Sequence, residues 1–133
     1  MPLEKTVAEL QDKFAKMIPA EPAAVMEHHV EFLRASGAVD QILKPGATAP
    51  AFTLKNQHGE DVSSSDLLKR GPAVVSFTRG SWCPYCSAEV RALNEAYDEF
   101  QQAGIELVVL SPQSLLRAQK RATAETQLAR GHG

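Results

Sequence analysis

A pair of cysteines at the junction of two hydrophobic patterns constrains the fold of this chain more than any other feature. Cys83 and Cys86 follow a β-rich apolar run at 73–78 (AVVSFT), which is typical of a buried strand. The segment after them, 84–103, carries apolar residues at the helical period, and a second β-rich run (IELVVL) occupies 105–110. This order predicts an α/β fold with a βαβ core, whose two strands are parallel.

The chain before this core has helical rather than β periodicity. Apolar residues at the helical spacing predict an amphipathic helix over 6–18, and Thr6 with Glu9 has the spacing of a capping box at its start. A second helix is expected over about 22–36. Both helices belong to a predicted N-terminal extension.

A stretch rich in proline and glycine, 44–50 (KPGATAP), separates the part with helical periodicity from the part with β-rich runs. We therefore expect a helical extension over residues 1–43 and an α/β domain over 44–133. The first part of that domain, 51–54 and 61–63, is expected to form a small hairpin or extended arm. Short helical turns are expected over 64–69, and the alanine-rich tail after Pro112 is a plausible but poorly amphipathic helix.

Length and charge exclude several classes of protein. A chain of 133 residues with 44% hydrophobic and 23% charged residues should fold as a globular protein without disulfide staples. The net charge of −2 and the absence of long runs of one sign disfavour nucleic acid or an anionic membrane as partner. No apolar run is long enough for a membrane span or a secretory signal, so a cytoplasmic location is expected.

The position of the Cys83-Pro84-Tyr85-Cys86 motif predicts redox chemistry. Backbone N–H groups and the positive dipole end at a helix N-terminus stabilise a thiolate, so Cys83 is the candidate nucleophile. Pro84 suits the first helical turn, because the N–H that it lacks would have no intrahelical acceptor there. Cys86 lies three residues further on the same helical face, within disulfide reach, and can resolve a mixed disulfide or sulfenic acid on Cys83.

Three alternatives do not involve catalysis. The pair could be a structural disulfide, although closing so short a loop adds little stability, or two inert core cysteines. A zinc site would need further ligands. The histidines available for it have no ligand-like spacing to the pair: His28, His29, His58 and His132.

Residues around the motif could support a reactive thiol. Arg79 could reach the thiolate as a cation, and Trp82 could shield it or form a docking surface for a partner. Hydroxyl groups that could bond to sulfur or to a peroxide oxygen are present on Thr78, Ser81 and Tyr85. Each of these residues is also compatible with an ordinary role at a strand end or on the surface.

At FTRGSWCPYC (77–86) the chain resembles peroxiredoxin-like proteins of the alkyl hydroperoxide reductase and thiol-specific antioxidant family, which have the thioredoxin fold. The resemblance extends over 45–114, and the helices before it are similar to an extension found in some members. It implies thiol-dependent reduction of hydroperoxides without a bound cofactor. Cys83 would become a sulfenic acid, and Cys86 with an external reductant such as thioredoxin would restore the thiol.

The motif departs from the usual peroxiredoxin pattern P-x-x-x-T-x-x-C. The matching positions hold Ser76 and Gly80, so Thr78 or Ser81 would have to supply the hydroxyl that positions peroxide. The dithiol motif instead looks like that of glutaredoxins and thioredoxins. A general thiol-disulfide oxidoreductase is therefore the main alternative, and a peroxide or a disulfide could be the substrate.

The resemblance to the thioredoxin fold fades near residues 114–119, and no proline follows Pro112 to serve as the family's cis-proline. These observations predict that the C-terminal half of the fold is incomplete. An exposed edge on the 73–78 strand would then allow a homodimer, and Cys83 would be more exposed than in a complete domain. A non-catalytic interaction module is the third functional hypothesis.

Overall fold

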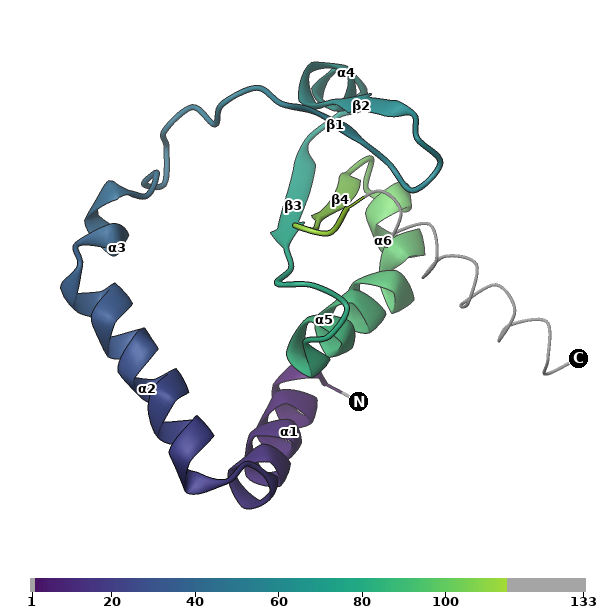
Figure 1. Cartoon of the computed structure of the whole chain (residues 1–133). Helices are drawn as coiled ribbons and strands as arrows, with labels where there is room; N and C mark the ends of the chain where they lie inside the picture. The colour runs from purple at the N-terminus through teal and green to yellow at the C-terminus, as the bar shows by residue number, and fades with distance from the viewer. Residues whose placement is uncertain (1, 115–133) are drawn as a thin grey trace, which may run out of the picture. The chain divides into compact units, whose positions relative to one another are not determined.

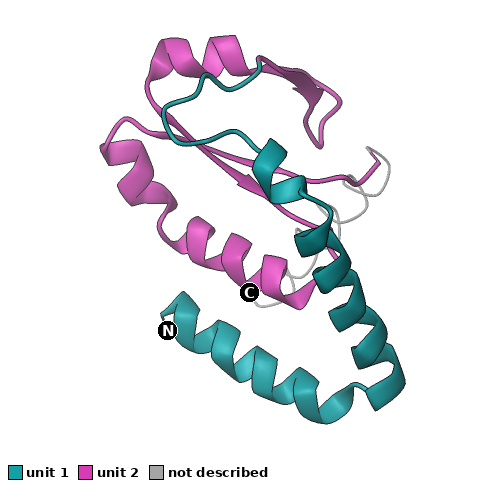
Figure 2. Ribbon diagram, turned by 90° about the vertical axis from the view of Figure 1, so that its left-hand side faces the viewer, with its two compact units in different colours: residues 1–50 teal, residues 51–133 magenta. Residues whose placement is uncertain are grey.

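The computed structural model describes residues 2–114 and shows a mixed α/β protein (Figure 1). The chain divides into two compact units, with the division between Pro50 and Ala51 (Figure 2). The first unit is helical, and the second holds both sheets. The domain boundary expected a few residues earlier, between residues 43 and 44, stays a prediction.

The first unit contains α1 (Leu3–Met17), α2 (Ala20–Ala35) and the short α3 (Ala38–Gln41). The capping-box interpretation is wrong. Helix α1 begins three residues before Thr6, with Pro2 at its N-cap and no side-chain cap. The Thr6 hydroxyl lies within the first turns and donates to the Pro2 carbonyl oxygen at 3.4 Å.

Helix α2 starts slightly earlier than its sequence pattern predicts. Pro19 is its N-cap, and Pro22 lies in the first turn, where a missing N–H interrupts no intrahelical hydrogen bond. The predicted stop at Gly37 is confirmed: this residue has a φ of 75° and is followed by α3. No described residue of the three helices is buried.

The second unit opens with the predicted hairpin. Strands β1 (Thr53–Lys55) and β2 (Asp61–Ser63) are antiparallel, and α4 (Ser64–Arg70) follows directly. The Ser64 hydroxyl accepts a hydrogen bond from the Phe52 N–H at 2.9 Å, which fastens the start of the hairpin to the start of the helix.

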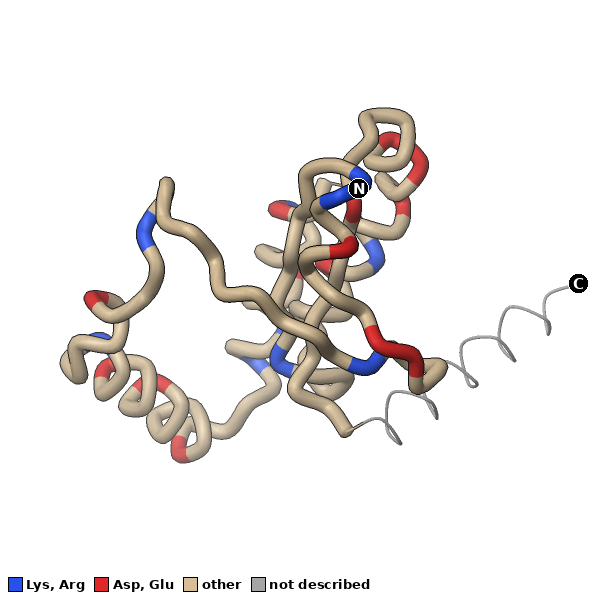
Figure 3. Tube along the Cα trace, turned by 90° about the horizontal axis from the view of Figure 1, so that it is seen from above, with Lys and Arg blue, Asp and Glu red and all other residues tan. Residues whose placement is uncertain are grey.

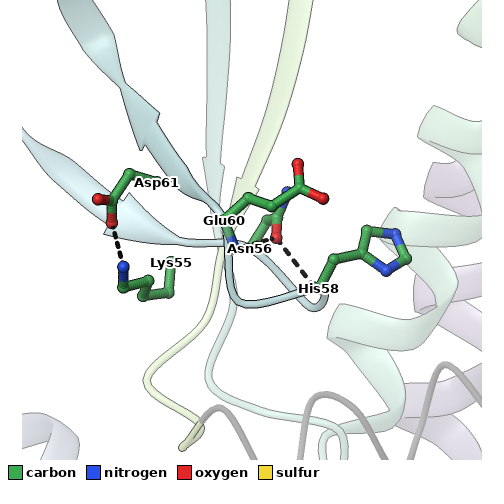
Figure 4. Close-up of polar contacts among 5 residues, drawn as sticks. All are labelled: Lys55, Asn56, His58, Glu60 and Asp61. Atoms are coloured by element: carbon green, nitrogen blue, oxygen red, sulfur yellow. Dashed lines mark hydrogen bonds and ion pairs between the residues drawn. The ribbon is translucent and has the colours of Figure 1, made fainter.

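One asparagine organises the turn between the hairpin strands. The Asn56 side-chain oxygen accepts hydrogen bonds from the N–H groups of His58 at 2.9 Å and Glu60 at 3.0 Å (Figure 4). Lys55 and Asp61 form an ion pair across the strands at 2.7 Å. His58 is therefore a turn residue, in agreement with a structural role for this histidine.

The strand–helix–strand prediction for the core is confirmed. Strands β3 (Ala73–Phe77) and β4 (Glu106–Leu110) are parallel, with Ala73 opposite Glu106 and Phe77 opposite Leu110. Both strands start where Gly71 passes Gly104: a Cβ added at Gly71 would lie 2.3 Å from the Gly104 carbonyl oxygen. Only glycine permits this close approach, which places the beginnings of the two strands side by side.

The connection between the two strands is not one helix over 84–103. It consists of α5 (Pro84–Glu95) and α6 (Tyr97–Gln102), separated by Ala96, whose φ of −88° and ψ of 2° interrupt the helical backbone. Residues 91–96 contain neither proline nor glycine, so the sequence carries no signal for this break. The functional motif is thus at the start of a helix of 12 residues.

The prediction that both strands are buried is wrong. Their residues are mostly half-buried, and Val74, Phe77 and Val109 are 39%, 75% and 38% exposed. The reason is that, in the described part of the chain, β3 and β4 pair only with each other, so much of this sheet is uncovered. The arrangement is consistent with a partial thioredoxin-like fold. Leu67 and Cys83 are the buried apolar residues of the described segment.

Acidic and basic residues are both spread along the described trace, without a long contiguous block of one sign (Figure 3). Within residues 2–114, no helix combines the length and apolarity that a membrane crossing requires. The helix proposed for the tail after Pro112 lies outside the described residues.

Candidate redox site

The cysteine motif lies where the chain leaves β3 and enters α5. Cys83 is the N-cap of the helix and Pro84 occupies its first turn, as predicted. The Cys83 N–H donates to the Gly80 carbonyl oxygen at 3.2 Å, and the Ser87 N–H donates to the Cys83 carbonyl oxygen at 3.1 Å. The first bond closes the loop after the strand, and the second begins the helix.

Cys83 is 2% exposed, so the expectation of an unusually exposed nucleophile is wrong. Cys83 is enclosed although the strands nearby are only half-buried, and the loop after β3 returns to it through the hydrogen bond with Gly80. The candidate nucleophile is therefore also one of the most enclosed positions in the described chain.

The electrostatics of Cys83 favour a thiolate. Burial raises the pKa of this thiol, because it disfavours the charged form. Hydrogen bonds from the Cys86 N–H, the Cys86 thiol and the Tyr85 N–H outweigh that effect, with a smaller contribution from the positive charge of Arg79. The net result is a Cys83 pKa below its ordinary value, as a helix N-terminus predicts.

Cys86 is half-buried and faces both the loop and a small cavity. Its sulfur accepts a hydrogen bond from the Arg79 N–H at 3.3 Å. The cavity has a volume of about 180 Å³. Its lining includes Cys86, Thr78, Gly80, Val90 and Gln113. Cys86 is thus in contact with Cys83 on one side and borders an open space on the other.

Arg79 and Trp82 form a pair in the same loop. The guanidinium carbon of Arg79 lies 4.8 Å from the centre of the Trp82 ring, within the range of a cation–π interaction. Trp82 is 66% exposed. The positive charge of Arg79 contributes to the lowered pKa of Cys83.

Two of the three candidate hydroxyl groups near the motif, those of Thr78 and Ser81, form hydrogen bonds elsewhere in the fold. Thr78 donates to the Leu110 carbonyl oxygen at 3.2 Å, which continues the pairing of β3 with β4. Ser81 accepts a hydrogen bond from the Gln113 side-chain amide at 2.8 Å. Gln113 was not indicated by the sequence, since it lies 32 residues from Ser81 and belongs to no motif.

Ser76, which stands where the usual peroxiredoxin pattern has proline, also has a role that the sequence did not reveal. Its hydroxyl donates to Glu89 Oε1 at 2.7 Å and connects β3 to α5. This bond ties together the two elements that position the cysteines. A proline at position 76 would supply neither the hydroxyl nor a backbone N–H.

The zinc hypothesis gains no support from the described residues. No group of three or more His, Cys, Asp or Glu side chains in this part of the chain could hold a metal ion. Cys83 and Cys86 are both free thiols.

A dithiol whose first cysteine caps a helix after a parallel strand, with a lowered pKa, is typical of the redox motifs of thioredoxin-like proteins. The chain belongs to the AhpC/TSA family, whose model matches residues 45–129. The match includes the hairpin, β3, the cysteine motif, α5, α6 and β4. The family resemblance seen in the sequence is thereby confirmed.

Curated relatives match over about half of the chain. This chain is 41% identical over 69 residues to the chloroplastic peroxiredoxin Q of Sedum lineare. The matched stretch covers 52% of this chain and 37% of that protein. The peroxiredoxin Q of Suaeda salsa is 39% identical over 66 residues, or 50% of this chain and 30% of that protein. A thiol-disulfide oxidoreductase ResA from Geobacillus thermodenitrificans is 33% identical over 66 residues, which is 50% of this chain and 37% of that protein. The matched stretch thus spans about a third of these relatives.

Proposed function

We propose that the protein is a thiol peroxidase that reduces hydroperoxides through the Cys83 thiolate, with Cys86 as the resolving thiol. The observation that carries this proposal is the lowered pKa of an enclosed N-cap cysteine that is hydrogen-bonded to a second thiol. Membership of the AhpC/TSA family and the similarity to peroxiredoxin Q support the same reaction.

The proposed reaction balances in three steps. The Cys83 thiolate attacks one oxygen of the O–O bond, which breaks to give a sulfenic acid on Cys83 and an alkoxide that takes up a proton as alcohol. The Cys86 thiol then attacks the sulfenic sulfur, which forms a disulfide and releases water. An external dithiol of the thioredoxin type reduces this disulfide, takes up the oxidation as its own disulfide and regenerates both thiols.

The enclosure of Cys83 bears on the substrate. A residue that is 2% exposed admits a small hydroperoxide more readily than the disulfide of a folded protein. The hydrogen-bonding groups at the helix N-terminus would also stabilise the anionic sulfur during the attack. This favours peroxide over protein disulfide as the oxidant at Cys83.

Peroxide consumption by the reduced full chain, with dithiothreitol as reductant, tests the proposal. Wild-type protein should turn over repeatedly, and Cys83→Ser should consume no peroxide above the background rate. Cys86→Ser keeps the nucleophile and should accumulate a sulfenic acid that dimedone traps on Cys83. Unchanged peroxide consumption in Cys83→Ser would falsify the proposed function.

General thiol-disulfide exchange is the second candidate. The observation in its favour is the half-buried Cys86 beside the cavity near Gln113, because a second accessible thiol suits exchange with another dithiol. The similarity to ResA points in the same direction. Reduction of insulin disulfides at a rate above that of peroxide would favour this function. A cytoplasmic location remains part of the proposal, to be checked by imaging of the tagged chain.

A further inference from the structure

The loop between β3 and α5 contains one residue whose missing side chain matters. Gly80 has a φ of +139°, which side chains rarely allow, and it is buried between exposed neighbours. A Cβ added here would lie 2.8 Å from Nε1 and 2.9 Å from Cδ1 of the Trp82 ring. The indole therefore occupies the space that any other residue at position 80 would need.

The same indole carries the Arg79 guanidinium, whose carbon lies 4.8 Å from the ring centre. Both side chains are exposed, so the ring position depends on local contacts within the loop rather than on a surrounding core. Gly80 supplies the contact on one side of the ring and Arg79 approaches its face. Moving the ring away from Gly80 would thus also change where the cation is held.

Arg79 is the charged side chain that acts on Cys83 among the described residues, and Cys86 is the other titratable group that does so. We propose that Gly80 is a positioning residue: its lack of a side chain leaves room for the Trp82 ring, which holds the Arg79 guanidinium in the loop next to the cysteine motif. This role of Gly80 rests on the proposed function, because a lowered thiol pKa matters only to a reactive Cys83. The ionisation of Cys83 can nevertheless be measured without any substrate.

The test is a titration of the reduced full chain in a Cys86→Ser background. This substitution leaves Cys83 as the only thiol and keeps a hydroxyl donor at position 86. The ultraviolet absorbance of the thiolate then gives the pH midpoint of Cys83 directly. Arg79→Gln removes a positive charge that acts on the thiolate and should raise the midpoint by roughly half a pH unit, and Gly80→Ala and Trp82→Ala, which only displace that charge, should raise it by no more than this amount.

The decisive comparison is the double variant of Gly80→Ala with Trp82→Ala. If Gly80 acts by making room for the indole, the double variant should show the same midpoint as Trp82→Ala alone. The matched control is Gly104→Ala, because Gly104 also has a positive φ, of 70°, but an added Cβ meets nothing within 4 Å. Its midpoint should stay at that of the parent.

Two results would overturn the inference: a midpoint in Trp82→Ala equal to that of the parent, or a Gly80→Ala shift that persists undiminished in the Trp82→Ala background. Should Gly80→Ala not fold, as judged by circular dichroism, Trp82→Ala and Arg79→Gln alone and combined decide the matter. If the midpoint shifts of Trp82→Ala and Arg79→Gln add up in the double variant, the two residues do not act on Cys83 together, which contradicts the inference. An absence of peroxide turnover would remove the proposed function while leaving the titration result intact.

Discussion

The Arg79 main-chain N–H donates a hydrogen bond to the Cys86 sulfur at 3.3 Å, while the Arg79 side chain lies over Trp82. One residue thus contacts the second thiol through its backbone and contributes positive charge to the first through its side chain. Because the backbone contact does not depend on the identity of the side chain, the two contributions can be separated by mutation.

The hydrogen bond from the Cys86 side chain should be visible in the reactivity of Cys83. Cys86→Ala removes this donor, so the pKa of Cys83 should rise and its alkylation by iodoacetamide should begin at higher pH. Cys86→Ser is the matched control and should keep most of the wild-type profile. The rate is followed against pH by peptide mass spectrometry, and superimposable profiles of the Ala and Ser variants would contradict the assigned role of the bond.

The lowered pKa of Cys83 also predicts how stability depends on pH. A thiol whose pKa is lower in the folded state stabilises the fold fully above its unfolded pKa of about 8.5, and this contribution disappears as the pH falls through the folded value. The stability difference between reduced wild type and Cys83→Ser should therefore shift in favour of wild type as the pH rises through this window. Urea unfolding at several pH values measures it, and a pH-independent difference would argue against a lowered pKa.

The Ser76–Glu89 hydrogen bond should contribute to the stability of the βα junction. Ser76→Ala removes a half-buried donor to a carboxylate, with an expected loss of about 1–2 kcal/mol in the free energy of unfolding. Ser76→Thr keeps the hydroxyl and should lose less. Chemical denaturation measures both variants, and equal losses would show that the hydroxyl is unimportant.

The Thr78 hydroxyl is expected to contribute to the pairing of β3 with β4 and not to bind substrate. The Leu110 carbonyl oxygen also accepts the Thr78 N–H at 2.8 Å, so Thr78→Val leaves that acceptor satisfied. The expected cost is therefore small, about 0.5 kcal/mol, at the lower end for a single hydrogen bond. Thr78→Ser is the control. A loss of several kcal/mol specific to Thr78→Val would indicate that this hydroxyl does more than continue the strand pairing.

Self-association through the free edge of β3 remains a proposal, and it predicts a concentration-dependent mass. In the described residues this strand pairs only with β4, which leaves one edge open to a second copy. Val74→Lys places a charge on the strand, where Val74 is 39% exposed, and should shift the population toward monomer. Val39→Lys makes the same exchange at an exposed position in α3 and should not. Analytical ultracentrifugation distinguishes these outcomes, and a wild type that is monomeric at all concentrations would exclude the dimer.

Local patterns were sufficient to predict the elements around the motif. The alternation of β-rich runs with a helical period located β3, α5 and β4, because each pattern records which face of its element packs inward. The glycine at residue 37 likewise marked the end of α2. These signals lie within a few residues of the structures that they specify.

Features that depend on distant residues could not be predicted in the same way. The break at Ala96 has no proline or glycine to mark it, and the contact of Gln113 with Ser81 joins positions 32 residues apart. The enclosure of Cys83 could not be predicted either, because the burial of a residue at a strand–helix junction depends on tertiary packing that no local pattern records. Similarly, the role of Gly80 depends on where the Trp82 ring lies, which no sequence period records.

If Cys83 reacts as proposed, its location among the most enclosed residues couples its oxidation to the stability of the fold. An oxygen atom added to this enclosed sulfur increases the volume that the packed surroundings must hold, so the sulfenic form should be less stable than the thiol. The sulfenic form should therefore have a lower melting temperature than the thiol form. Attack of Cys86 on the sulfenic sulfur, which forms a disulfide and releases the oxygen as water, would remove this strain.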